Sequence, residues 1–254
     1  MPRAKKKWGQ NFLCDSNVIK SIISAINPSC HDPFLEIGPG YGALTDYLVD
    51  ISNNVIAVEI DRECVQSLKK RHNNLVILNQ NILHLDWSCL SGKKRIVGNL
   101  PYYISSKLLE LFCNHHSNFI DIHIMLQREV AKRILSNPGD VEFSRISIFV
   151  QAYFDVEHIF DIEPGCFRPS PSVVSSFIRL KTKSNPRPIS NLCYSIIKSA
   201  FSQRRKMIRN SLSSFFSELN FEKMGIDSTK RAQEMSREEY ETMAVFFSKI
   251  GKNC

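Results

Sequence analysis

An amide, a proline and an aromatic ring stand together in Asn99-Leu100-Pro101-Tyr102, directly after a strand predicted over residues 95–98. These residue types suit chemistry on an aromatic amine, whose nitrogen is a poor nucleophile because its lone pair is delocalised into the ring. The Asn99 side-chain oxygen and a backbone carbonyl near Leu100 or Pro101 can accept from the two N–H groups, which favours a pyramidal nitrogen with a localised lone pair. Tyr102 can stack on the base. The motif alone also fits a simple proline turn.

A glycine-rich loop precedes this motif in the chain. The strand predicted over 34–37 ends in Gly38-Pro39-Gly40-Tyr41-Gly42, where glycines permit positive φ and close approach of a ligand. Their spacing differs from the G-x-G-x-x-G dinucleotide pattern, which disfavours a bound pyrophosphate. Glu59, at the end of the next predicted strand, can accept from both hydroxyls of a ribose. With Asn99, these features indicate an S-adenosylmethionine-dependent methyltransferase acting on an amino group of a base.

Weaker candidates follow the other predicted strands. Asn81, in Gln80-Asn81-Ile82, can accept from the adenine amino group of the cofactor, as many loop asparagines can. Asp61, two residues after Glu59, is expected to face solvent. Phe167 precedes a stiff loop with two prolines and can pack on the second face of a splayed-out base. Taken alone, Phe167 is better explained by core packing.

Alternating strands and helices position these residues. This alternation predicts an α/β fold, with a mostly parallel sheet of the Rossmann-like type covered on both faces. Strands are predicted over 34–37, 55–60, 76–78, 95–98 and 120–126, and also near 149–154 and 175–180. Helices are predicted over 17–26, capped by Asp15 or Ser16, and over 43–51, 62–70, 106–113 and 128–135.

A polar, proline-bearing break at Lys183-Ser184-Asn185-Pro186-Arg187-Pro188 predicts a domain boundary. We therefore expect a methyltransferase domain over 1–182 and a small all-helical domain over 183–254. Helices are predicted over 192–216, 228–232 and 236–250. The last of these starts at a capping box, Ser236-Arg237-Glu238-Glu239.

Composition points to a protein of the cytoplasm with a polyanionic partner. The 254 residues carry a net charge of +8. Residues 183–254 hold 13 Lys and Arg against 7 Asp and Glu, so +6, and residues 1–182 hold +2. Eight scattered cysteines form no metal-binding pattern and fit reduced thiols. No apolar run is long enough to span a membrane, and no leader sequence is apparent.

Two segments combine basic and aromatic residues in a way that suits RNA. They are residues 5–13, with Lys5, Lys6 and Lys7 before Trp8, and residues 200–210, which contain Arg204, Arg205, Lys206 and Arg209. Cations suit an RNA backbone and aromatic rings suit exposed bases. An ordinary basic helix surface explains each segment equally well when it is taken alone.

Taken in order, many segments of this chain resemble the KsgA family of ribosomal RNA adenine dimethylases. The resemblance covers nearly the whole chain and is carried by W-G-Q-N-F-L (8–13), L-E-I-G-P-G-Y-G-A-L-T (35–45), V-E-I-D (58–61), N-L-P-Y-Y-I-S (99–105), Q-R-E-V-A-K-R (127–133), F-R-P-S-P-S-V (167–173) and A-F-S-Q-R-R-K-M-I-R-N-S-L (200–212).

The resemblance implies a substrate and a set of site residues. The substrate would be 16S rRNA within an immature 30S subunit, dimethylated at N6 of two adjacent adenosines in its 3′-terminal hairpin. The enzyme would be a monomer without membrane contact, acting late in subunit biogenesis. The family's cofactor positions fall on Asn11, Leu13, Gly38, Glu59, Asn81 and Asn99. Its catalytic positions fall on Asn99, Leu100, Pro101, Tyr102 and Phe167.

One position departs from the family, because Asn81 stands where the family usually has Asp. The amide keeps an acceptor and loses a charge, so we expect slightly weaker cofactor binding and an active Asn81→Asp variant. One alternative is a macrolide-resistance dimethylase acting on 23S rRNA, whose motif resembles N-I-P-Y where this chain has Leu100. Another is an RNA-binding or transcription factor that no longer needs catalysis, against which the intact Gly38, Glu59 and Asn99 argue. A Rossmann protein that is not a methylase fits the loop spacing least well.

Overall fold

The computed structural model describes residues 5 and 8–250, and it divides into two compact units. The first unit comprises Met1–Ala131 and Phe154–Ser184, and the second comprises Lys132–Tyr153 and Asn185–Cys254. The break near residue 184 lies two residues beyond the boundary expected from the sequence. Residues 132–153, which the sequence assigned to the first domain, fall in the second unit. Of the basic segment 5–13, Lys6 and Lys7 lie outside the described residues.

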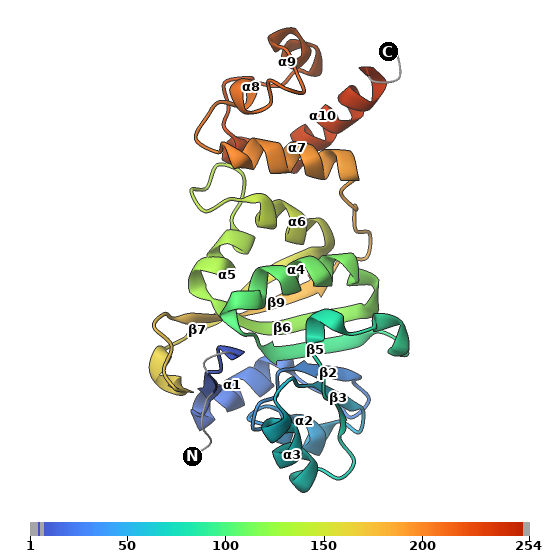
Figure 1. Cartoon of the computed structure of the whole chain (residues 1–254), viewed down its shortest axis with the longest axis vertical. Helices are drawn as coiled ribbons and strands as arrows, with labels where there is room; N and C mark the ends of the chain where they lie inside the picture. The colour runs from blue at the N-terminus through green and yellow to red at the C-terminus, as the bar shows by residue number, and fades with distance from the viewer. Residues whose placement is uncertain (1–4, 6–7, 251–254) are drawn as a thin grey trace. The chain divides into compact units, whose positions relative to one another are not determined.

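A seven-stranded sheet forms the centre of the first unit (Figure 1). Its spatial order is β4 (Val76–Leu78), β3 (Val55–Val58), β2 (Phe34–Ile37), β5 (Lys94–Asn99), β6 (Phe119–Gln127), β9 (Ser175–Thr182) and β7 (Phe154–Ile162). The strands from β4 to β6 are parallel, and β9 runs antiparallel to both β6 and β7. This confirms the expected α/β fold. A separate pair, β1 (Phe12–Leu13) with β8 (Phe167–Arg168), is antiparallel.

Amphipathic helices follow the strands in the first unit. They are α1 (Ser16–Ile26), α2 (Thr45–Ile51), α3 (Arg62–Arg71), α4 (Ser105–Asn114) and α5 (Arg128–Leu135), of which the last crosses into the second unit. Asp15 caps α1 by accepting from the backbone N–H groups of Asn17 and Val18. Ile22, Leu48 and Leu68, from three different helices, pack with Phe34 in one core cluster. Burying their apolar faces holds these helices on the sheet.

The strand predicted near 149–154 is wrong. Residues Arg145–Tyr153 form helix α6, and strand β7 begins at Phe154. The run Ile146-Ser147-Ile148-Phe149-Val150 alternates in a way that imitates a strand. In the structure Ser147 and Ile148 are both buried, as they can be on a helix whose neighbouring positions face the core. The Ser147 hydroxyl also accepts from the Ser144 backbone N–H at 2.9 Å at the start of this helix.

The second unit is helical beyond residue 185, but its helices differ from those predicted. The long helix expected over 192–216 is divided into α7 (Asn191–Ser202) and α8 (Ile208–Ser211). The helix expected over 228–232 is absent from the described chain, because this backbone pairs with 207–209: Ile208 N–H donates to the Lys230 carbonyl at 2.6 Å. An unpredicted helix, α9 (Glu218–Met224), ends at Gly225 with φ +66°.

The last helix, α10 (Arg237–Ile250), starts at the predicted capping box. The Ser236 N–H donates to Glu239 Oε2 at 2.7 Å, and the Glu239 N–H donates to Ser236 Oγ at 3.2 Å. The second unit has its own apolar core, in which Tyr240 is fully buried and donates to the Ala232 carbonyl at 2.9 Å. No described helix combines the length and the apolar character needed to cross a membrane.

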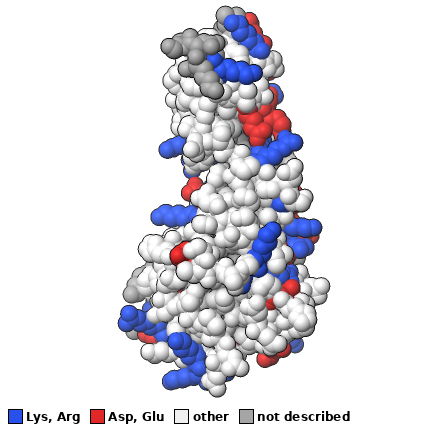
Figure 2. Space-filling model, turned by 90° about the vertical axis from the view of Figure 1, so that its right-hand side faces the viewer, with Lys and Arg blue, Asp and Glu red and all other residues white. Residues whose placement is uncertain are grey.

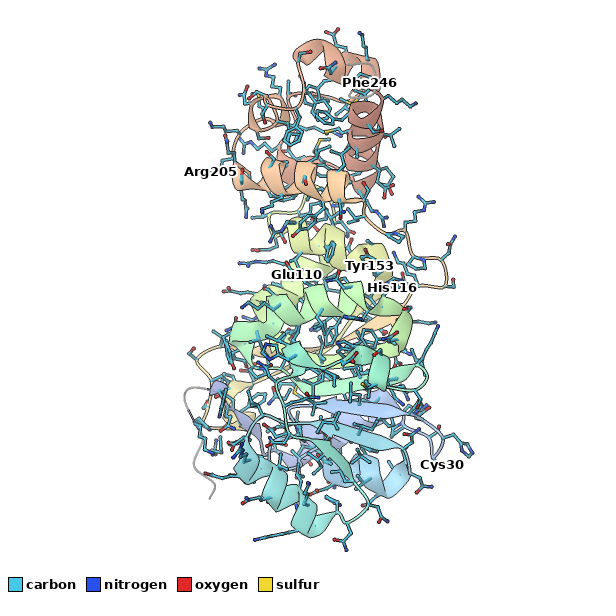
Figure 3. All side chains as sticks on the ribbon, turned by 45° about the vertical axis from the view of Figure 1, so that its right-hand side comes forward. Cys30, Glu110, His116, Tyr153, Arg205 and Phe246 are labelled. Atoms are coloured by element: carbon cyan, nitrogen blue, oxygen red, sulfur yellow. The ribbon has the colours of Figure 1, made fainter. Side chains whose placement is uncertain are left out.

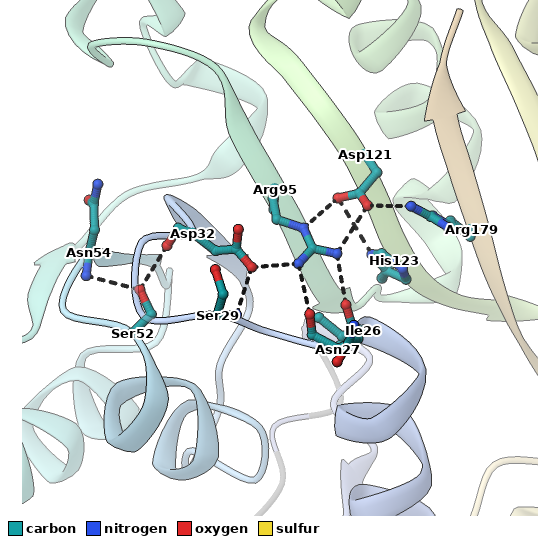
Figure 4. Close-up of polar contacts among 10 residues, drawn as sticks. All are labelled: Ile26, Asn27, Ser29, Asp32, Ser52, Asn54, Arg95, Asp121, His123 and Arg179. Carbon is teal, nitrogen blue, oxygen red and sulfur yellow. Dashed lines mark hydrogen bonds and ion pairs between the residues drawn. The ribbon is translucent and has the colours of Figure 1, made fainter.

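A buried ionic network joins β5, β6 and β9 at the ends of these strands far from Asn99 (Figure 4). Arg95 contacts Asp121 at 2.9 Å and Asp32 at 2.7 Å, and Arg179 contacts Asp121 at 3.0 Å. Burial opposes ionisation of Asp121, but the hydrogen bonds from these partners outweigh it and keep the pKa of Asp121 below its ordinary value. His123 lies beside the network, and desolvation lowers its pKa to about 4. The network ties central strands at the end of the sheet opposite the site described next.

Candidate active site

A pocket of about 340 Å³ lies at the carboxyl ends of the parallel strands of the first unit. The sheet order reverses beside β2, because β3 and β4 lie on one side of it and β5 and β6 on the other. Ligands of open α/β sheets bind at such a reversal, and small-molecule pockets of about 300–1,000 Å³ are usual. The lining includes Asn11, Leu13, Gly38, Glu59, Asn81, Asn99, Leu100, Pro101 and Tyr102. Residues far apart in the sequence thus meet in one cavity.

The glycine loop after β2 forms one wall of the pocket. Gly38, Gly40 and Gly42 have φ of +65°, +56° and +90°, a region that side chains disfavour. A Cβ on Gly40 would lie 2.9 Å from two carbons of the Phe12 ring, so this glycine is also required for close packing. The loop therefore leaves its backbone bare toward the cavity, as the sequence predicted.

Glu59 links the glycine loop to the end of β3. Its Oε2 accepts from the Gly40 N–H at 3.0 Å, and its Oε1 accepts from the Asp61 N–H at 2.8 Å. Burial raises the pKa of Glu59, and these two N–H groups oppose the rise. Each carboxylate oxygen can accept more than one hydrogen bond, so Glu59 can hold the loop and still accept from a ribose hydroxyl.

Asp61 does not face solvent, so that expectation is wrong. Its side chain is 4% exposed and accepts from Lys5 Nζ at 2.7 Å and from Gln10 Nε2 at 2.9 Å. Burial opposes ionisation of Asp61, but these hydrogen bonds hold its pKa below the ordinary value. Asp61 therefore fastens the N-terminal segment beside the pocket. The burial of Asp61 could not be predicted from the sequence, because its partners Lys5 and Gln10 are more than fifty residues away in the chain.

The Asn99 side chain has a fixed orientation at the end of β5. Its Nδ2 donates to the Asn11 carbonyl at 2.8 Å. The amide oxygen, Oδ1, is therefore the atom left to accept from a ligand. Leu100 is 1% exposed and anchors the following turn, while the Pro101 carbonyl accepts from the Ile104 N–H at 3.1 Å. That contact favours the Leu100 carbonyl as the second acceptor of the motif.

Tyr102 lines the pocket with a partly buried ring, and its hydroxyl lies 2.6 Å from Ser175 Oγ on β9. Burial raises the pKa of the Tyr102 phenol, so it remains neutral and able to donate at neutral pH. Ser175 is fully buried. This contact fixes the position of the hydroxyl end of the ring that was predicted to stack on a base. Ser175 was not among the residues predicted from the sequence, because no motif marks it.

Asn81 begins a short 3₁₀ turn after β4, and its Oδ1 accepts from the Leu83 N–H at 3.0 Å. The amide oxygen predicted to accept from the cofactor's adenine is thus already engaged once, and the remaining polar atom is the donor Nδ2. Leu13 and Asn11 reach the pocket from the β1 segment.

Phe167 is not brought to the pocket with the other predicted residues. Its side chain is fully buried in the core cluster that includes Ile162 and Phe177. Phe167 pairs with Leu13 across the β1–β8 ladder, and it is Leu13 that reaches the lining. In this structure Phe167 supports the pocket wall from behind.

Glu36 also lines the pocket, although it was not predicted as a site residue. It is 2% exposed, and its Oε2 has no hydrogen-bond partner among the described residues. Burial raises the pKa of Glu36 to about 8. A carboxyl group inside the otherwise apolar strand Phe34–Ile37 was the available sign. At neutral pH this carboxyl is therefore mostly protonated, and it offers the pocket a polar group rather than a negative charge.

These features fit S-adenosylmethionine. The bare glycine loop admits a close ligand, Glu59 suits a ribose, and the unpartnered Oε2 of Glu36 can form a hydrogen bond with a polar group of the ligand. Within the described chain, no group of three or more His, Cys, Asp or Glu side chains could hold a metal ion.

Comparisons with known proteins agree with this site. The family model described as "Ribosomal RNA adenine dimethylase" matches residues 1–249. A "Ribosomal RNA small subunit methyltransferase A" from Wigglesworthia glossinidia brevipalpis is 42% identical over 94% of this chain and 96% of its own length. A protein of the same name from Dechloromonas aromatica is 37% identical over 96% and 98%.

Solved structures show the same fold. A dimethyladenosine transferase from Plasmodium falciparum superposes with a TM-score of 0.82 at 25% identity, covering 94% of this chain and 98% of that one. The 23S rRNA methyltransferase ErmE superposes with a TM-score of 0.72 at 24% identity, covering 94% and 100%, which shows the fold alone. The chain, with its glycine loop, Glu59 and Asn99 around one pocket, belongs to the ribosomal RNA adenine dimethylase family of S-adenosylmethionine-dependent methyltransferases.

Proposed function

We propose that this enzyme transfers two methyl groups to N6 of each of two adjacent adenosines in the 3′-terminal hairpin of 16S rRNA. Its substrate is an immature 30S subunit in the cytoplasm, and it acts as a monomer late in subunit assembly. The observation that carries the proposal is the fixed orientation of Asn99, whose Nδ2 is held by the Asn11 carbonyl at 2.8 Å. This contact presents Oδ1 as an acceptor in the pocket that also holds Glu59 and the glycine loop.

An acceptor in that place can activate an exocyclic amine. One N–H of adenine N6 donates to Asn99 Oδ1, and the other donates to the carbonyl of Leu100. Both contacts strengthen as the nitrogen becomes pyramidal and its lone pair leaves the ring, so they stabilise the transition state more than the ground state. Bound S-adenosylmethionine would supply the methyl group of its sulfonium and leave as S-adenosylhomocysteine, and the methylated nitrogen would then release one of its protons to solvent.

The remaining contribution is positioning. The Tyr102 ring, held by Ser175 at 2.6 Å, stacks on the adenine and aims N6 along the line of attack. Only a nucleotide turned out of its helix can enter a pocket of this depth. An enzyme that acts on unpaired or flipped bases therefore fits this cavity better than one that reads an intact duplex.

Two observations support a small-subunit substrate. The curated relatives reported above carry the name small subunit methyltransferase A over nearly the full chain. The second unit, in addition, exposes a basic run after α7, which includes Arg204, Arg205 and Lys206. Arg205 projects from the segment between α7 and α8 in Figure 3. Figure 2 shows basic side chains in more places than acidic ones on one face of the molecule. Such cations suit the phosphates of folded RNA.

The test uses purified enzyme, labelled S-adenosylmethionine and 30S subunits that lack the dimethylation, with 23S-containing particles beside them. We expect label as dimethyladenosine in 16S rRNA alone. The Asn99→Ala variant removes both the Asn11 contact and the acceptor, and it should bind 30S subunits without methylating them. Label in 23S rRNA would instead assign the chain to the resistance enzymes. Cofactor binding without label in either RNA would contradict the proposal.

A further inference from the structure

Tyr103 is the most exposed aromatic ring beside the pocket. Its side chain is 61% exposed, although it belongs to the lining of the cavity. It adjoins Tyr102 in the short 3₁₀ turn Tyr102–Ile104 that leads into α4. The two rings have different environments, because Tyr102 is partly buried and tied to Ser175, whereas most of Tyr103 is open to solvent. A large ring exposed at a pocket mouth loses its contact with water when a ligand covers it, which favours binding of a flat apolar surface.

The Tyr103 ring rests on the backbone of Gly9. A Cβ on Gly9 would lie 3.2 Å from Tyr103 Cδ1 and 3.4 Å from Cε1, so one part of the ring packs on a residue without a side chain. Gly9 has φ +56°, which side chains disfavour. The segment that carries Gly9 is itself held, since Gln10 donates to Asp61 at 2.9 Å. The ring is thus supported from one side and accessible from the other.

A cation follows Tyr103 closely in the chain. Lys107 is exposed one helical turn further along, at the start of α4. Tyr103 lies in the 3₁₀ turn just before this helix, so the exposed Lys107 ammonium is available to the phosphates of an RNA whose base lies on the ring. Aromatic rings next to cations are the usual platform for unpaired bases.

We propose that Tyr103 is a stacking site for the unpaired nucleobase next to the target adenosine. The identity of the target base rests on the proposed function, but the stacking itself needs only single-stranded RNA. A base on Tyr103 keeps the neighbouring nucleotide at the mouth of the pocket while Tyr102 contacts the base inside. The site therefore takes a nucleobase of any type, because every base presents a flat face.

The first experiment measures stacking directly. A short single-stranded RNA carries 2-aminopurine beside one adenosine, and its fluorescence and affinity are followed with wild type and with Tyr103→Ala, Tyr103→Trp and Ile120→Ala. Ile120 is the matched control, because it is also an exposed apolar residue, at 44%, but lies near the start of β6, whereas the pocket lies at the carboxyl ends of the parallel strands. We expect wild type to quench the 2-aminopurine fluorescence. Tyr103→Ala should abolish this quenching and lower the affinity for the RNA on the order of tenfold. Tyr103→Trp should retain both, and Ile120→Ala should match wild type.

The second experiment separates this inference from the proposed function. Methylation of 30S subunits by the same variants should show a raised KM for Tyr103→Ala and an unchanged affinity for S-adenosylmethionine by calorimetry. Absence of quenching with wild type, or equal quenching and KM for wild type and Tyr103→Ala, would overturn the stacking site. A wild-type enzyme that fails to methylate 16S rRNA but quenches through Tyr103 would overturn the proposed function and leave the stacking site standing.

Discussion

Asn81→Asp should tighten cofactor binding. In the structure Asn81 Oδ1 accepts from the Leu83 N–H at 3.0 Å, so the atom free to meet the cofactor's adenine is the donor Nδ2. An aspartate caps the turn equally well and presents a second acceptor, which matches the adenine amino group. A hydrogen bond to a charged acceptor contributes about 1.5–3 kcal/mol, whereas the donor Nδ2 of Asn81 forms no hydrogen bond with an amino group. A gain of about 1.5 kcal/mol predicts a Kd lower by about tenfold.

Asn79→Asp provides a control with the same change of charge. Asn79 Nδ2 donates to the Glu59 carbonyl at 2.8 Å, so an aspartate there loses the hydrogen bond and sets a carboxylate against a carbonyl oxygen. Leaving the Glu59 carbonyl without its hydrogen bond from residue 79 costs about 1–3 kcal/mol. Since Glu59 contacts the glycine loop, we expect both weaker cofactor binding and a lower free energy of unfolding.

Calorimetric titration with S-adenosylmethionine and urea unfolding of both variants make the comparison. The two substitutions add the same negative charge at positions two residues apart, so any general attraction between that charge and the cofactor is the same in both variants. A change in cofactor affinity that is opposite in sign for the two variants therefore reports on their local hydrogen bonds. Weaker cofactor binding by Asn81→Asp, with unchanged unfolding, would refute the donor assignment. An inactive but folded Asn81→Asp would refute the placement of residue 81 in the site.

Other contacts lead to three further predictions. Ser175→Ala should lower kcat more than cofactor affinity, measured by methylation kinetics and calorimetry, because it releases the Tyr102 hydroxyl at 2.6 Å. Gly40→Ala should weaken cofactor binding about tenfold or more in calorimetry, because φ of +56° costs about 1–2 kcal/mol and the new Cβ meets Phe12 at 2.9 Å. His123 binds its proton near pH 4 when folded and near 6.5 when unfolded, so the unfolded state binds more protons between these values. Glu36 contributes in the opposite sense, because its folded pKa of about 8 lies above its unfolded value. The difference in urea unfolding between wild type and His123→Phe, in which Glu36 is common to both proteins, should therefore show about 3 kcal/mol of stability lost through His123 as pH falls from 6.5 to 4.

Each of these predictions has a matched variant. Tyr102→Phe should lose the same contact as Ser175→Ala, and additive effects of the two in a double variant would contradict the pairing. Gly92 has φ +66°, and no atom lies within 4 Å of the place that a Cβ would take, so Gly92→Ala should cost stability and leave cofactor affinity unchanged. His123→Phe should gain stability relative to wild type as pH falls from 6.5 to 4, and parallel curves for the two proteins would assign no pH-dependent stability to His123.

The fold was largely predictable because its strands and helices carry strong local patterns. Phe34–Ile37 and Arg128–Leu135 were predicted to the residue. The errors arose where distant partners decide the outcome. Arg145–Tyr153 is a helix although its residues alternate, and the 228–231 segment pairs with backbone that the sequence cannot bring beside it.

In the candidate site, too, residues with a local signal were predicted, and residues whose position depends on distant partners were not. Asn99 and Glu59 were found because their types and positions after strands carry chemical meaning. Asp61 was misplaced because its partners come from the N-terminal segment, and Ser175 was missed because its role depends on a ring from another strand. Phe167 was predicted from a motif, but strand pairing with Leu13 buries it in the core.

The pairing of β1 with β8 bears on the order in which the protein matures during synthesis. Phe12 pairs with Arg168, so the first wall of the pocket leaves the ribosome early but finds its partner only after 168 residues have been made. Residues 132–153, which lie between β1 and β8 in the chain, belong to the second unit. Part of the second unit is therefore synthesised before β1 and β8 can pair. Contacts between such distant residues form late in folding. A nascent chain thus has the parallel strands β2 to β6 before it acquires a complete cofactor pocket, and an enzyme truncated before β8 would have these parallel strands without β9 and without a finished site.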